Sequence, residues 1–97
     1  MMVERTLLVK ARLGLHARAA AKVVRVARGF DSKFELRRVD NSVSADAKSI
    51  LSVLMLAASR GTELQATVDG IDEEAALNAI DKLFAEGFGE MEQEPPG

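Results

Sequence analysis

The residues best suited to chemistry stand close together near the N-terminus, in the run LGLHARAA over residues 13–20. His16 is the only histidine of the chain, and Arg18 follows it two positions later. Gly14 lets the backbone turn without a Cβ penalty, just before a segment with helical spacing. The first amides of a helix lack partners within the helix, and the helix dipole favours an anion beside them. The sequence therefore predicts a phosphate site built around an imidazole.

His16 has the chemistry of a phosphoryl acceptor. A neutral imidazole is a nucleophile at physiological pH, and the phosphoramidate that it forms passes its phosphoryl group on readily. Transfer between two proteins needs an exposed nucleophile on a convex surface, with helix-end amides and Arg18 neutralising the transferring group. The simpler alternative is that His16 only caps a helix.

The amino-acid composition excludes several other kinds of site. The chain has no cysteine, which excludes thiolate zinc sites, iron–sulfur clusters, disulfides and cysteine nucleophiles, and we expect no metal and no cofactor. The formal net charge is -2 and the only aromatic residues are four phenylalanines, a composition that disfavours binding to nucleic acid. No apolar run approaches a membrane span and no signal peptide is apparent, so we expect a cytoplasmic protein without membrane insertion.

Periodic patterns predict one domain over residues 1–88, followed by an acidic flexible tail over residues 89–97. Alternating residues predict strands over 6–11, 33–37, 43–45 and 62–69. Helical spacing predicts one helix from His16 to Gly29, a short one over 49–58 and a last one from Asp72 to Gly87. The order is β-α-β-β-α-β-α. Because the strands alternate in polarity, we predict an α+β open-faced sandwich, with a four-stranded antiparallel sheet and three helices on one face.

The last predicted helix has both a start signal and an apolar face. Asp72 is expected to cap its N-terminus, because an aspartate side chain there can accept from the first amides. Its expected core residues are Ala76, Ile80, Leu83 and Phe84.

Basic residues recur at near-helical spacing along the first predicted helix. They are Arg18, Lys22, Arg25 and Arg28. This basic stripe beside His16 predicts steering of an acidic partner. The alternative is an ordinary solvated helix face.

The second predicted helix is apolar almost all the way round. Leu51 and Leu54 could both be core residues, but a helix of this kind on a single-layer domain must expose some of its surface. We therefore predict a docking patch that this helix shares with the first one. Its expected apolar and flanking members are Ala17, Ala21, Lys48, Ile50, Leu51 and Leu54, beside Lys22, Arg25 and Arg28 of the stripe.

Together these residues resemble the HPr family of phosphocarriers in the bacterial sugar phosphotransferase system. Residues 14–18 (GLHAR) are similar to the family's phosphohistidine signature, and residues 48–50 (KSI) to its regulatory serine motif. Gly29-Phe30, Arg60-Gly61-Thr62 and Asp72-Glu73 also stand at the family's spacing. Each motif is weak by itself, but the set in this order is specific and spans nearly the whole chain.

The resemblance implies roles for particular residues. His16 would be the phosphohistidine, Arg18 its arginine partner and Ser49 a kinase target. The protein would accept a phosphoryl group from a phosphoenolpyruvate-dependent enzyme and pass it to sugar-specific components, as a monomeric substrate of enzymes rather than an enzyme. A serine kinase or phosphorylase would be a further partner. The alternatives are a nitrogen-related regulatory paralogue that uses the same histidine, and an interaction module that is not phosphorylated.

Ser49 has a simpler explanation as well, since a serine before an apolar helix is commonly only its N-cap. A phosphate on Ser49 would place about two negative charges beside the docking patch and against an acidic partner.

The sequence departs from the family's pattern at two places. Ala19 stands where the family usually has a proline. Because alanine does not fix φ as proline does, it would make the loop softer. The hairpin between Phe34 and Val43 is about two residues longer than usual, and Ser42 replaces the turn glycine.

Overall fold

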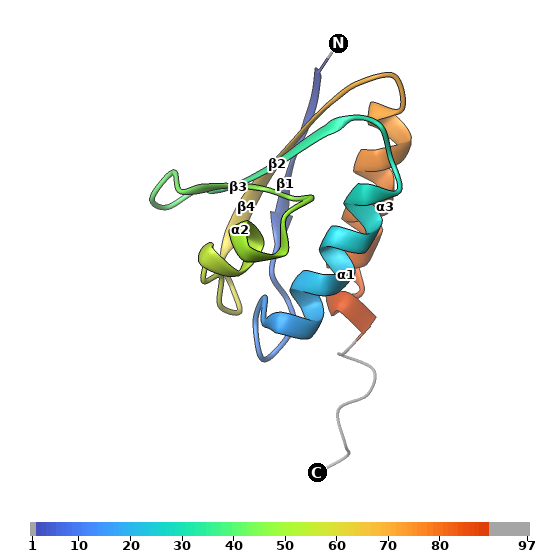
Figure 1. Cartoon of the computed structure of the whole chain (residues 1–97). Coiled ribbons are helices and arrows are strands. Elements are labelled where there is room, and N and C mark those ends of the chain that lie inside the picture. Colours follow the sequence, from blue (N-terminus) through green and yellow to red (C-terminus); the bar gives the residue numbers. More distant parts are fainter. Residues whose placement is uncertain (1, 90–97) are drawn as a thin grey trace.

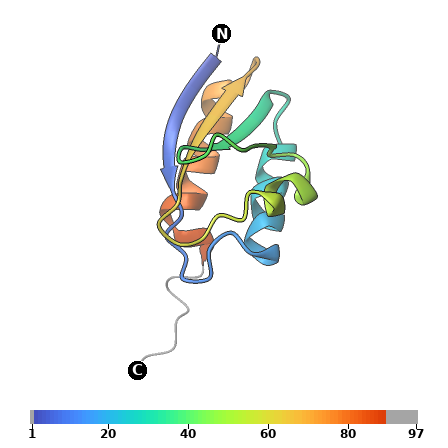
Figure 2. The same ribbon diagram turned by 90° about the vertical axis from the view of Figure 1, so that its left-hand side faces the viewer.

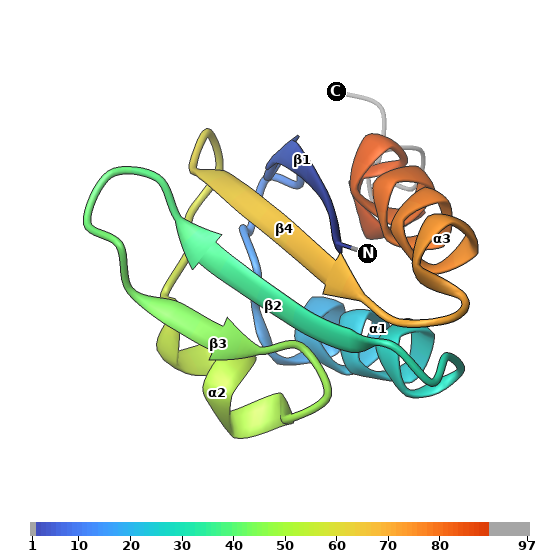
Figure 3. The ribbon, with the colours of Figure 1, turned by 90° about the horizontal axis from the view of Figure 1, so that it is seen from above.

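A computed structural model describes residues 2–89 of the chain (Figure 1). The elements are β1 (Met2–Leu8), α1 (Ala17–Arg28), β2 (Lys33–Arg38), β3 (Ser44–Asp46), α2 (Ile50–Met55), β4 (Glu63–Asp69), α3 (Glu73–Ala85) and a short 3-10 turn η1 (Gly87–Gly89). The strands form one antiparallel sheet in the order β1-β4-β2-β3, with the helices on one side of it (Figure 3). The predicted open-faced sandwich is therefore confirmed. The predicted tail lies outside the described residues from position 90 onward.

Alternation along the strands places the core between the sheet and the helices. Leu36 of β2 pairs with Ala66 of β4 at the centre of the sheet, and neither side chain is exposed. From α1, the buried face consists of Ala19, Ala20, Val23, Val24 and Ala27. From α3, Ala76, Ile80 and Phe84 are buried as predicted, but Leu77 joins them and Leu83 packs only partly buried at the edge.

The first strand runs earlier than its alternation predicts, from Met2 to Leu8 rather than over residues 6–11. Val9 and Ala11 are buried as the alternation indicates, but they lie beyond the residues of β1 that pair with β4. The Val9 amide donates to the Thr62 carbonyl at 3.0 Å, and the Val9 carbonyl accepts from the Gly61 amide at 2.8 Å. Apolar alternation therefore continues past Leu8 because the loop that follows is packed into the core.

The second helix is shorter than predicted, since α2 ends at Met55 instead of Ala58. Ala57 adopts φ +50°, in the left-handed region, and an α-helix cannot continue through that conformation. The segment from Leu56 to Ser59 is therefore a turn that leads toward β4. This turn becomes part of the candidate site below.

Asp72 stands at the predicted N-cap position of α3, but its side chain makes no capping hydrogen bond. The carboxylate instead accepts from the backbone amides of Asp31 at 2.8 Å and Ser32 at 3.0 Å, and from the Ser32 hydroxyl. Glu73 closes the turn by accepting from the Gly70 amide at 3.1 Å. The prediction of a capping role for Asp72 is wrong, because the loop before β2 offers this carboxylate three donors.

We expect Asp72 to make the fold acid-sensitive. Hydrogen bonds from the Ser32 side chain and then the Asp31 amide hold the pKa of Asp72 below its ordinary value of 3.8. Stability gained from a lowered carboxyl pKa is present above that ordinary value and is lost as the pH falls through the folded-state pKa. Between neutral pH and roughly pH 3, the free energy of unfolding measured in urea should fall less for Asp72→Asn than for the wild type. Equal losses would contradict this assignment.

The described part of the chain carries neither a membrane span nor a cluster of metal ligands. Between residues 2 and 89, no helix is both long enough and apolar enough to cross a membrane. Over the same residues, no group of three or more histidine, aspartate and glutamate side chains could hold a metal ion.

Candidate functional site

His16 lies at the N-terminus of α1 as its N-cap residue. Its backbone is extended, with φ -79° and ψ -177°, and its carbonyl accepts the Ala20 amide at 2.7 Å. The Nδ1 atom accepts a hydrogen bond from the Arg18 amide at 3.2 Å. An accepting Nδ1 carries no proton, so the ring proton of the neutral imidazole is on Nε2. The nucleophilic lone pair of His16 therefore points at the Arg18 amide in the first turn of α1.

The loop before His16 is held against the turn that follows α2, and Figure 2 shows these two segments side by side. The Leu15 amide donates to the Ala58 carbonyl at 2.8 Å. Gly14 has φ +70°, and a Cβ on it would lie 2.7 Å from the Ala58 oxygen and 2.9 Å from the Ser59 Cα. Gly14 is thus needed for its backbone conformation and for close packing, and the second requirement cannot be read from the sequence.

The residues that follow His16 begin the helix directly. Arg18 is exposed in the first turn, and its backbone amide faces the Nδ1 lone pair of His16. Ala19 is completely buried, and α1 starts at Ala17 with no proline in its first turn. The helix N-terminus is therefore formed by the histidine cap and by core packing.

The basic stripe divides into two kinds of residue. Arg18, Arg25 and Arg28 are exposed, whereas Lys22 is half-buried and its Nζ donates to the Phe88 carbonyl in η1 at 2.6 Å. The Arg28 Nε donates to the Lys48 carbonyl, just before α2, at 2.9 Å. Lys22 and Arg28 therefore also tie α1 to its neighbours, a structural role that spacing along a helix does not reveal.

Ser49 is the N-cap of α2, and its hydroxyl accepts from the Ser52 amide at 3.4 Å. Lys48 beside it makes two contacts besides the one that its carbonyl makes with Arg28. Its amide donates to the Asp46 carboxylate at 2.9 Å, and its Nζ donates to the Phe30 carbonyl at 2.8 Å. The ammonium group of Lys48 is thus directed at the loop after α1 rather than at the apolar face of α2.

The predicted docking patch is partly assembled. Ile50 is 44 % exposed and Leu51 66 % exposed, while Leu54 is half-buried against the core. Ile50 lines a groove between α1 and α2 together with Ala21, Val24, Arg25, Arg28 and Gly29. Ala17 is exposed at the start of α1 but does not line this groove. Two further apolar side chains whose exposure the sequence did not indicate are Met55, at the end of α2, and Leu13, in the loop before His16, which are 71 % and 68 % exposed.

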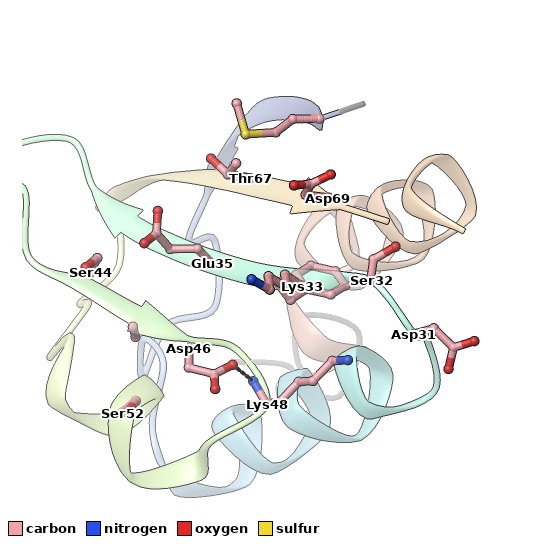
Figure 4. A pocket seen from close by; sticks show the side chains of 13 residues that line it. Asp31, Ser32, Lys33, Glu35, Ser44, Asp46, Lys48, Ser52, Thr67 and Asp69 are labelled. Atoms are coloured by element: carbon pink, nitrogen blue, oxygen red, sulfur yellow. Dashed lines mark hydrogen bonds between the residues drawn. The ribbon is translucent and has the colours of Figure 1, made fainter. Parts of the chain in front are cut away.

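A separate hollow lies over β2, β3 and β4. The lining side chains that are labelled in Figure 4 are all polar. Lys33, Glu35 and Asp46 contribute to it, and Lys48 is the only predicted site residue in its lining. His16 lies elsewhere, at the start of α1. The chemistry expected of the imidazole therefore does not take place in this hollow.

An open-faced sandwich with a histidine at the N-cap of its first helix narrows the class of protein considerably. The family profile described as "PTS HPr component phosphorylation site" matches residues 3–86. The chain belongs to the HPr family of phosphocarriers of the phosphotransferase system. Members of this family interact with enzymes of that system.

Individual relatives cover almost the whole chain. It is 47 % identical over 89 residues to the phosphocarrier protein HPr of Treponema pallidum, covering 92 % of this chain and 99 % of the relative. It is 38 % identical over 90 residues to the phosphocarrier protein NPr of Escherichia coli, covering 93 % and 99 %. The crystal structure of HPr-C-His from Thermoanaerobacter tengcongensis superposes with a TM-score of 0.85 at 34 % identity, covering 90 % of this chain and 96 % of the other.

Proposed function

We propose that the protein is a histidine phosphocarrier. His16 accepts a phosphoryl group from the first, phosphoenolpyruvate-dependent enzyme of the phosphotransferase system and passes it to sugar-specific components. The observation that carries this proposal is the direction of the His16 Nδ1 lone pair, toward the amide of Arg18 at the start of α1. A phosphoryl group bound there would lie where amide donors and the helix dipole favour an anion.

The transfer step follows from this geometry. The Nδ1 lone pair of His16 attacks phosphorus as the bond between phosphorus and the donor breaks, and the donor keeps that electron pair. The Arg18 amide, released from Nδ1, donates to a phosphoryl oxygen, and the exposed Arg18 guanidinium offsets the charge on the others. Nε2 keeps its proton throughout. The protein is thus a substrate of the enzymes on either side of it, and we propose further that it is a monomer in the cytoplasm.

The test is incubation of the full chain with phosphoenolpyruvate and the first enzyme of such a system, followed by intact mass measurement. We expect a gain of one phosphoryl group that is lost in acid and retained in base, as for a phosphoramidate. No gain in mass, or an adduct that survives acid, would contradict the proposal and favour an interaction module that is not phosphorylated.

The similarity to NPr of Escherichia coli favours a second candidate, a nitrogen-related regulatory phosphocarrier that uses the same histidine. The two candidates differ in their acceptor rather than in their chemistry. Transfer rates from phosphorylated protein to a sugar-specific acceptor and to a nitrogen-related acceptor separate them, and we expect the sugar-specific acceptor to be faster.

We expect the basic stripe to speed encounter with the donor enzyme. Arg25 is exposed and lies beside the groove between α1 and α2, where an acidic partner would approach. Arg25→Glu should lower the second-order transfer rate by about threefold to tenfold, and added salt should reduce this difference because it screens exposed charges over about 8 Å. Arg37→Glu on the open face of the sheet is the matched charge control. An equal loss in both variants would rule out steering by the stripe.

We propose that Ser49 is a negative switch, phosphorylated by a serine kinase. Ser49→Asp should slow transfer to His16 several-fold, because it places a negative charge between Lys48 and the exposed Ile50, against an acidic partner. Its free energy of unfolding should stay level or rise by about 0.3–1 kcal/mol, since an anion favours a helix N-terminus. Ser49→Asn retains a capping acceptor without the charge and should transfer normally. Normal transfer by Ser49→Asp would leave Ser49 as a cap only.

A further inference from the structure

Arg38 is the last residue of β2, at the base of the long hairpin that leads to β3. Its amide donates to the Val43 carbonyl at 2.8 Å, and its carbonyl accepts from the Ser42 amide at 2.9 Å. The side chain is only 17 % exposed. Its Nη1 atom donates to the carbonyls of Leu56 at 2.9 Å and Ala57 at 3.2 Å. Arg38 thus connects the hairpin to the end of α2, which lies near it in Figure 1.

Asp40 orients the guanidinium of Arg38 from within the hairpin. Its two carboxylate oxygens accept from Nε at 2.9 Å and from Nη2 at 2.7 Å, a bidentate pair. These hydrogen bonds from Arg38 hold the pKa of Asp40 below its ordinary range. The pair leaves Nη1 directed at the turn after α2. Asp40, within the hairpin, therefore aims Arg38 at this turn.

Arg38 supplies a cation and hydrogen-bond donors to the turn that it contacts. The last turn of α2 contains no basic residue of its own, although the carbonyls of a helix C-terminus favour a cation. Ala57 has φ +50°, which is unfavourable for a residue with a Cβ and persists only where neighbours hold it. The Arg38 guanidinium donates to the carbonyl of that residue. It is thus placed to stabilise the turn in this conformation.

The same turn holds the loop that presents His16. Ala58 follows Ala57 directly, and its carbonyl accepts the Leu15 amide at 2.8 Å. Gly14 packs on the Ala58 oxygen so closely that no Cβ fits. The hydrogen bonds from Arg38 to Leu56 and Ala57, and the one from Leu15 to Ala58, therefore join Arg38 to the residue before His16. A shift of Ala58 would move Leu15 and, with it, the imidazole.

We propose that Arg38, aimed by Asp40, is a positioning residue for phosphoryl transfer at His16. By holding the turn after α2, it keeps the Leu15 amide on the Ala58 carbonyl and fixes the loop that carries the nucleophile. This inference rests on the proposed phosphocarrier function. It adds a polar network that begins in the β2–β3 hairpin, away from the helix that carries His16.

Amide hydrogen exchange measured by NMR on the full chain tests this role. In Arg38→Gln, the Leu15 amide should exchange about tenfold faster, beyond any change at the Ala66 amide in the centre of the sheet, because a hydrogen-bond network to a charged group is lost. The rate of phosphoryl transfer to His16 should fall by a similar factor. Arg38→Lys should restore only part of the Leu15 amide protection and of the transfer rate, since an ammonium group cannot make the bidentate hydrogen bonds of a guanidinium.

Arg37→Gln is the matched control, since Arg37 is the exposed neighbour whose guanidinium donates to Gln65 on the open face of the sheet. Arg37→Gln should leave the exchange rate of the Leu15 amide unchanged. Asp40→Asn keeps Arg38 and serves if Arg38→Gln does not fold, with a smaller effect in the same direction. Unchanged protection of Leu15 in the Arg38 and Asp40 variants, or equal acceleration at Leu15 and Ala66, would overturn the proposal. The exchange measurement needs no phosphoryl donor, so its result is distinct from a failure of His16 to accept phosphate.

Discussion

A His16→Asn variant is expected to accept no phosphoryl group from phosphoenolpyruvate and the donor enzyme, while its first helix remains intact. Asparagine has no nucleophilic nitrogen, but its side-chain oxygen can accept the Arg18 amide as Nδ1 does in the wild type. The two roles of His16, acceptor and N-cap, are thus separated in one substitution. Intact mass checks the first role, and urea unfolding checks the second.

His16→Ala completes this comparison, because it removes both roles. It should also fail to accept phosphate, and its free energy of unfolding should fall by about 0.5–2 kcal/mol for the lost cap. If either variant gained a phosphoryl group at the wild-type rate, His16 would not be the acceptor. If both variants were equally stable, the capping hydrogen bond would contribute nothing measurable.

A Gly14→Ala variant is expected to impair both the fold and the transfer. The new Cβ would lie 2.7 Å from the Ala58 oxygen, and the residue would have to keep φ +70°. Backbone strain and overpacking together should cost roughly 2–4 kcal/mol in the free energy of unfolding. In the protein that remains folded, displacement of the loop should slow phosphoryl transfer at least about tenfold, since small misplacements of a reacting group have large effects on rate.

Gly61→Ala separates strain from close packing. Gly61 also has a positive φ of +92°, but a Cβ there would meet nothing within 4 Å. This variant should lose only the strain, about 1–2 kcal/mol, and should transfer at nearly the wild-type rate. Equal effects of the two substitutions would contradict the close contact between Gly14 and Ala58 as the cause.

The order of the elements could be predicted because it depends on local periodicity. Leu36 and Ala66 alternate with polar neighbours, and the helix after His16 has a continuous apolar face. The ends of elements were predicted less well. Tertiary contacts decide them, as at β1, which ends at Leu8 because Val9 bonds to the loop before β4, and at α2, which ends before the left-handed Ala57.

The centre of the candidate site was also apparent from the sequence, because Gly14, His16 and Arg18 are neighbours in the chain. The residues that hold this site in place were not apparent from the sequence. Arg38 contacts Leu56 across 18 positions in the sequence, and only the fold shows that the hairpin reaches the end of α2. A partly buried arginine at a strand end has no periodic signal.

The central claim is that the phosphoryl group is carried by the Nδ1 atom of His16. NMR of the isotope-labelled wild-type chain, recorded after phosphorylation by phosphoenolpyruvate and the donor enzyme, identifies the modified atom directly. We predict a phosphoramidate on Nδ1, with the Arg18 amide resonance displaced because its acceptor changes from nitrogen to a phosphoryl oxygen. Phosphate on Nε2, on any other residue, or on no residue at all would contradict the account.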